Sequence, residues 1–107
     1  SSIEAYLKSA TNLDPIEGFY LHPSYKLGIT RVGPNLFHAG VITTQNNNWK
    51  PGDVKLVIRK IGDRYEGTFY EGDKSDFSDH QVQLVDNILD FDIVFFEKVF
   101  PEVSYPK

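Results

Sequence analysis

The spacing of apolar segments is the feature that most restricts how this chain can fold. From Ile16 onward, short segments with alternating apolar and polar residues are separated by turns rich in glycine, proline, asparagine and aspartate. No separator is long enough for the crossover helix that parallel strands need, so the strands must pair antiparallel. The pattern predicts about eight strands, at residues 16–21, 25–31, 36–44, 53–60, 64–70, 80–85, 88–93 and 94–100.

The simplest arrangement of these strands is an up-and-down meander that closes into a small barrel. Closure removes exposed edge strands, and eight strands enclose a space that side chains can just fill. We therefore predict an all-β antiparallel barrel, with a two-sheet sandwich as the alternative. The side chains expected inside are Phe19, Leu27, Ile29, Val41, Leu56, Ile58, Tyr65, Phe69, Leu84, Leu89 and Phe91.

The fourth predicted strand gives the clearest orientation. Val54, Leu56 and Ile58 recur at every second position, which is typical of a strand with one buried face. Lys55 falls between the first two of them. We therefore expect Leu56 inside the barrel and Lys55 on the opposite, solvent-exposed face.

The N-terminal stretch is the only helical candidate. Residues 2–8 place Ile3, Tyr6 and Leu7 on one face, and the helix is expected to end before Asp14-Pro15. We predict one β-barrel domain over residues 1–101, in which residues 1–13 are the helix and lead-in. Residues 102–107 are expected to be a tail or a linker to a following segment. The chain begins with serine and lacks methionine, which suggests a mature product or a domain of a longer protein.

Composition excludes several partner classes. The net charge is −4 and the two signs are interspersed, whereas phosphate binding needs a concentrated basic patch, so nucleic acid is not expected as a partner. No apolar run is long enough to span a bilayer. Without cysteine, the chain has neither disulfides nor thiolate metal ligands.

Residues that could carry chemistry are present but dispersed. No two of His22, His38 and His80 have the spacing of a helical metal pair. The acidic segment with Asp73 and Asp76 lacks the ligand set of a calcium loop. No serine has a nucleophile-elbow setting, and no glycine-rich phosphate loop occurs. We expect no catalytic, cofactor or metal site, and therefore a non-enzymatic chain.

The loop that carries Trp49 is the best candidate for contact with a ligand or partner. A tryptophan beside asparagines can stack on a sugar ring or anchor another protein. We take Trp49, Asn47, Asn48 and Tyr70 as the candidate contact residues. The alternative is that the Trp49 ring caps one end of the barrel and is buried over its core.

Four stretches carry a resemblance to a known domain: Leu13–Tyr20 (LDPIEGFY), Trp49–Lys55 (WKPGDVK), Gly67–Tyr70 (GTFY) and Glu97–Pro101 (EKVFP). Together they resemble the small β domain that precedes the catalytic part in some secreted bacterial serine peptidases of the carboxy-terminal processing (tail-specific) type. The chain departs from that pattern at Tyr20, where tryptophan is expected. The catalytic residues of those peptidases lie outside the domain, so the resemblance implies nothing catalytic here. The glycine and aromatic residue that open the first strand also resemble lipocalin-like barrels.

The resemblance implies a non-catalytic accessory domain of a larger extracytoplasmic bacterial protein, such as a peptidase, that is periplasmic or secreted. Its partner would be an adjacent catalytic domain, or else a protein or peptide. Two alternatives stay open: a lipocalin-like carrier of a small apolar ligand, and a carbohydrate-binding module that uses Trp49.

Overall fold

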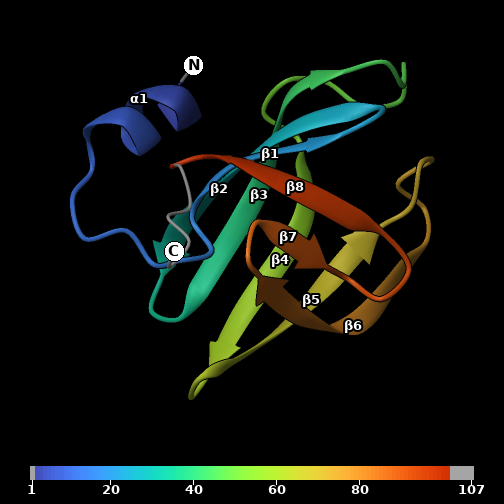
Figure 1. Cartoon of the computed structure of the whole chain (residues 1–107). Coiled ribbons are helices and arrows are strands. Elements are labelled where there is room, and N and C mark those ends of the chain that lie inside the picture. The colour runs from blue at the N-terminus through green and yellow to red at the C-terminus, as the bar shows by residue number, and fades with distance from the viewer. Residues whose placement is uncertain (1, 102–107) are drawn as a thin grey trace.

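The alternating segments form strands in the computed structural model, which describes residues 2–101. One helix precedes eight strands in the described part of the chain (Figure 1). The bounds are α1 (Ser2–Ser9), β1 (Gly18–His22), β2 (Tyr25–Gly33), β3 (Leu36–Thr44), β4 (Val54–Ile61), β5 (Arg64–Tyr70), β6 (Phe77–Val85), β7 (Ile88–Asp90) and β8 (Phe95–Phe100). Residues 102–107, for which we predict a tail, lie outside the described residues.

Each strand pairs antiparallel with the strand that follows it, and β8 pairs with β1 to close the barrel. The predicted eight-stranded up-and-down barrel with a short N-terminal helix is therefore confirmed, and the sandwich alternative is wrong. No helix within residues 2–101 has the length and apolar character needed to cross a membrane.

The strand bounds differ most from the prediction at β6, which begins at Phe77 rather than at residue 80, and near β7. The pattern predicts a strand over residues 88–93, but β7 stops at Asp90. Its carboxylate accepts the backbone N–H of Asp92 at 2.6 Å, and Asp92 adopts a left-handed φ of 72°. This local hydrogen bond turns the chain before Phe95, where β8 begins.

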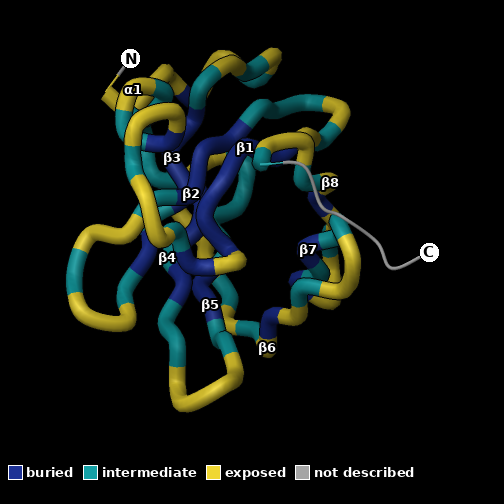
Figure 2. Tube along the Cα trace, turned by 60° about the vertical axis from the view of Figure 1, so that its left-hand side comes forward, coloured by how far each residue is buried: buried dark blue, intermediate teal, exposed yellow. Residues whose placement is uncertain are grey.

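The barrel interior holds the apolar core, and Figure 2 shows buried stretches along the strands and exposed residues in several of the hairpins. Most of the side chains predicted to be inside are there, but Phe19 is not. Phe19 pairs with Gly28, whose face lies against the helix, whereas Tyr20 pairs with Leu27 inside the barrel. Tyr65, Phe69 and Leu84 are only half-buried and pack against the core. The buried core residues are Ile16, Tyr20, Leu27, Ile29, Phe37, Ala39, Val41, Trp49, Leu56, Ile58, Val82, Leu89, Phe91 and Phe96.

Helix α1 packs on the outer face of β2 and β3, at two paired glycines. Gly28 and Gly40 lie opposite each other in the sheet. A Cβ at either position would overlap the Ile3 side chain, so only glycine lets the helix come this close. Leu7, which is 2% exposed, completes the contact.

Candidate functional site

Lys55 lies inside the barrel, so the predicted solvent-exposed position is wrong. In the pairing of β3 with β4, Ala39 opposes Leu56 but Gly40 opposes Val54, which leaves Lys55 as the extra residue of a β-bulge. The bulge breaks the alternation of side chains. Lys55 and Leu56 are therefore both buried, at 2% and 0% exposure, whereas Val54 is only half-buried.

The ammonium group of Lys55 is surrounded by aromatic rings. Its Nζ lies 4.3 Å from the ring centre of Trp49, 4.5 Å from that of Phe69 and 4.9 Å from that of Tyr25. It donates a hydrogen bond to the backbone carbonyl of Tyr70 at 2.5 Å. Burial lowers the pKa of Lys55 to about 8, and the Glu71 carboxylate partly opposes that shift. We call these four side chains, Lys55, Trp49, Phe69 and Tyr25, the lysine cage.

Trp49 covers the lysine cage at one end of the barrel. Its Nε1 donates to the Gly72 carbonyl at 2.9 Å, and Asn46 and Asn48 each point an amide nitrogen at the same oxygen, 3.4 Å away. These contacts hold the loop between β3 and β4 against the loop between β5 and β6. At 4% exposure the indole caps the barrel and has no open face.

Three of the four candidate contact residues take part in the contacts at this end. Trp49 and Asn48 share the Gly72 carbonyl, and Tyr70 supplies the carbonyl that holds Lys55. Asn47 is exposed at the tip of the loop. Contact of these residues with a ligand or partner stays a prediction, but a buried indole offers no platform for stacking.

The lead-in between α1 and β1 closes the other end of the barrel through Asp14, which is 7% exposed. Its carboxylate pairs with Lys60 Nζ at 2.7 Å and accepts the Tyr65 hydroxyl at 2.5 Å. Burial alone would raise the pKa of Asp14, but the Ile16 N–H, Lys60 and Tyr65 outweigh it and hold the pKa below its usual value. The polar groups of this cluster are paired with one another, so the cluster stabilises the closed end of the barrel.

Glu17 fastens the same lead-in to the strands and the helix. It is 1% exposed and accepts the Tyr6 hydroxyl at 2.6 Å and the backbone N–H of Arg31 at 2.8 Å on one oxygen. Its other oxygen accepts the Asp14 N–H at 2.8 Å. Gly18 then passes so close to the carbonyl of Phe100 that a Cβ would collide with it.

Two of the three histidines and two of the acidic residues make separate local contacts. His22 accepts the Ser24 N–H at a hairpin turn, and His80 contacts the Ser78 hydroxyl at 2.6 Å. Asp73 caps its own turn by accepting the Ser75 N–H, and Asp79 accepts the Thr68 hydroxyl. Within residues 2–101 no three His, Asp or Glu side chains gather in a way that could hold a metal ion.

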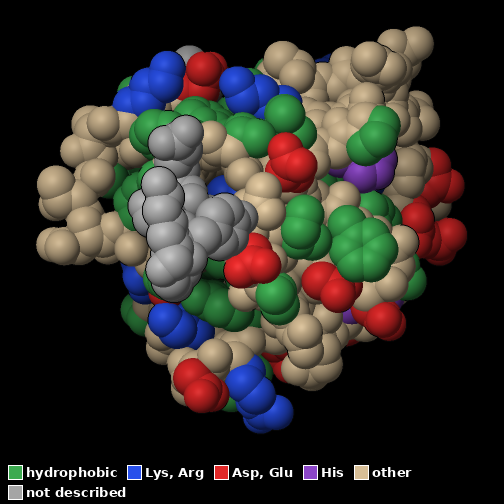
Figure 3. Space-filling view, in the orientation of Figure 1, with side chains coloured by type: hydrophobic (Ala, Val, Ile, Leu, Met, Phe, Trp, Pro, Cys, Tyr) green, Lys and Arg blue, Asp and Glu red, His purple; other side chains and the backbone are tan. Residues whose placement is uncertain are grey.

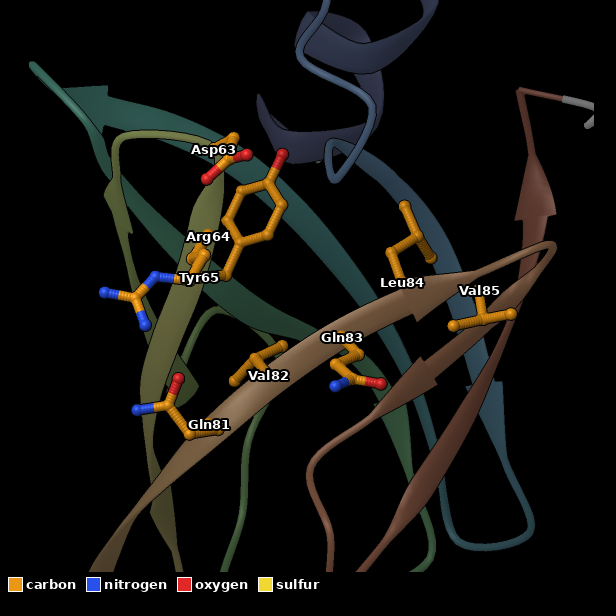
Figure 4. A pocket seen from close by; sticks show the side chains of 8 residues that line it. All are labelled: Asp63, Arg64, Tyr65, Gln81, Val82, Gln83, Leu84 and Val85. Atoms are coloured by element: carbon orange, nitrogen blue, oxygen red, sulfur yellow. The ribbon is translucent and has the colours of Figure 1, made fainter.

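A groove lies on the surface where β5 and β6 diverge (Figure 4). The last pair between these strands is Tyr65 with Val82, so the final residues of β6 pair only with β7. Half-buried Tyr65 and Leu84 lie beside polar and charged side chains in its wall. Both side chains also pack against the core, so the groove lies directly over the barrel interior.

Sequence reasoning missed Lys55, Asp14 and Glu17 as members of buried polar clusters. Asp14 and Glu17 flank the Pro15-Ile16 pair, which gives no sign that a helix and two strands will converge on them. Comparisons with protein-family models, with curated proteins and with solved structures found no match to this chain.

Proposed function

We propose that this chain is a non-catalytic interaction module whose barrel is a rigid support for a binding surface. The observation that carries the proposal is the packed interior: fourteen buried side chains form one continuous core inside the strands. Trp49 closes one end and the lead-in with Asp14 closes the other. A barrel of eight short strands has little volume beyond its own side chains, so binding must use the outside.

The two alternatives have less support. A carrier needs an internal cavity of a few hundred cubic ångströms, whereas the groove beside Tyr65 and Leu84 lies on the surface. A carbohydrate module needs an exposed aromatic face, and Trp49 is buried. The groove is the place where a carrier's ligand would enter.

We further propose that the module serves a larger extracytoplasmic protein, such as a peptidase, as the sequence resemblance implies. The residues of the resembling motifs lie where the barrel closes. Trp49 and Lys55 are at one end, Glu17 is at the other, and Gly18 is at the contact between β1 and β8. A domain that shares those motifs would need them for the same closure, which supports a common fold. Fractionation of cells that express the full gene tests the location, and a purely cytoplasmic product contradicts it.

The carrier alternative can be tested by thermal unfolding with palmitate, retinol and an apolar dye. We expect no rise in melting temperature, because a ligand at a hundred times its Kd would add about 2.7 kcal/mol and be readily detected. Leu84→Trp, which fills the groove, is the matched variant. Stabilisation by one of these ligands in the native chain, lost in Leu84→Trp, would replace the interaction module with a carrier.

A further inference from the structure

An apolar row crosses four strands on the outside of the barrel. Val85 of β6 pairs with Ile88 of β7, Ile88 pairs with Glu97 of β8, and Glu97 pairs with Leu21 of β1. Phe95 lies two residues before Glu97 and therefore on the same face. Phe95 is 59% exposed, Val85 57% and Leu21 42%, so large apolar side chains lie open to solvent here. We call these five residues the β8 face.

The β8 face is visible at the front of the molecule. Figure 3 shows hydrophobic side chains mixed with carboxylates over the region where Figure 1 places β7 and β8. A shallow groove runs through it, with Leu21, Ile88, Phe95 and Glu97 in its wall. Contiguous apolar surface rimmed by polar groups marks interaction sites more often than scattered exposed residues do.

Glu97 is the unusual member of the β8 face. Its two cross-strand neighbours are Ile88 and Leu21, and within residues 2–101 its carboxylate has no hydrogen-bond or ion-pair partner. Charges on exposed strands often protect a sheet edge from pairing with another chain. This barrel is closed at β8 and has no edge there, so edge protection does not explain Glu97.

We propose that the β8 face binds a protein segment that brings apolar side chains to Leu21, Ile88 and Phe95 and one arginine to Glu97. This inference rests on the interaction-module function and specifies its partner. When an apolar segment covers the face, the carboxylate loses water and needs a cation. A guanidinium is the best match, because it is weakly hydrated and forms two parallel hydrogen bonds with a carboxylate.

The charge of the β8 face favours this partner over a second copy of the chain and over an anionic lipid surface. A second copy of the chain in a two-fold dimer would bring the same acidic side chains to both sides of the interface. Asp86 and Asp92 lie in the turns before and after β7, and Asp90 pairs with Phe95, so these three carboxylates border the face and would repel an anionic lipid surface. An apolar segment with a positive charge is complementary to both features of the face.

The test uses amide NMR spectra of the full chain titrated with the peptide acetyl-Leu-Val-Arg-Val-Leu-amide. We expect concentration-dependent shifts at Leu21, Ile88, Phe95 and Glu97. The same peptide with neutral citrulline in place of arginine keeps the shape but loses the charge. It should bind about tenfold or more weakly, because hydrogen bonds to charged groups are the stronger ones.

Two variants with the same charge change provide the control. Glu97→Gln should weaken the arginine peptide to the affinity of the citrulline peptide, whereas Asp63→Asn, in the hairpin turn between β4 and β5, should leave it unchanged. Equal binding of both peptides, no shifts at millimolar peptide, or shifts confined to another face would each overturn the proposal.

Sedimentation of the chain alone tests the second copy as occupant. A concentration-dependent dimer that is lost in Phe95→Asp would overturn the arginine-bearing partner. Any of these outcomes would overturn the proposed partner but not the interaction-module function. That function would be refuted by a different result, stabilisation by an apolar ligand that Leu84→Trp removes.

Discussion

Replacing Lys55 with methionine should change how the stability of the barrel depends on pH. In the folded chain burial lowers the pKa of Lys55 from its ordinary 10.5 to about 8. Between these two values the unfolded chain holds the proton and the folded chain does not. The unfolded state then binds more protons, so the contribution of Lys55 to the free energy of unfolding rises with pH.

The magnitude follows from the size of the pKa shift. The full shift is worth about 3 kcal/mol, of which about 2 kcal/mol should appear between about pH 7 and pH 9.5. Methionine has a similar length, fills the same space and has no proton to lose. The native chain should therefore gain about 2 kcal/mol relative to Lys55→Met across that interval.

Urea unfolding at several pH values, followed by circular dichroism and by the fluorescence of Trp49, measures this difference. At one pH the comparison also contains the lost hydrogen bond to the Tyr70 carbonyl and the lost contacts with the rings. For protonated Lys55 these are a constant offset, and any weakening of them on loss of the proton is already contained in the folded pKa. Burial also raises the pKa values of Tyr20 and Tyr65. Both tyrosines are present in the native chain and in Lys55→Met, so their contribution to the pH dependence cancels in the difference. A difference that stays constant within about 0.5 kcal/mol from pH 7 to 9.5 would refute a depressed Lys55 pKa.

Three further predictions test other parts of the fold. Leu56→Ala should lower the free energy of unfolding by about 2–5 kcal/mol, and Val54→Ala by much less, because only Leu56 is fully buried; equal urea midpoints would contradict the bulge. Because the pKa of Asp14 is lower in the folded than in the unfolded chain, Asp14 contributes stability above about pH 4, and this contribution is lost as the pH falls through the pKa of the folded state. When the free energy of unfolding is followed into acid, Asp14→Asn should therefore lose less stability than the native chain. Gly28→Val should displace α1 and expose Ile3 and Leu7, which circular dichroism would record as lost helix while the barrel signal persists.

The sequence predicts the strands and their closure well because both depend on repeated, local signals. Alternation identifies each strand, and short turns permit only antiparallel neighbours. The orientation of single residues is less predictable. A bulge places Lys55 inside, and one strand position separates outward Phe19 from inward Tyr20. Neither the bulge nor this register is determined by the residues of one strand alone, because both depend on the partner strand.

The clustering of the candidate contact residues was partly predictable, while their contact with a ligand or partner stays a prediction. An asparagine-rich loop with a tryptophan identifies an unusual segment, and Asn48 and Trp49 of this loop meet Tyr70 of β5 at one end of the barrel. The direction of the ring was not predictable, since it depends on Gly72, which lies far away in sequence. The β8 face was missed because its row crosses four strands, and only the register places Glu97 between Ile88 and Leu21.

The two ends of the barrel lead to the same conclusion about where binding can occur. At one end, the Gly72 carbonyl ties two loops together over a charged lysine, and any ligand entering there would have to break those contacts and uncover the ammonium. At the other end, entry would separate Lys60 from the buried Asp14 carboxylate. Leaving a buried charge without its partner is strongly destabilising. Both ends of the barrel are therefore closed by charged groups, whereas covering the β8 face would give a cation to Glu97, which has no hydrogen-bond or ion-pair partner within residues 2–101.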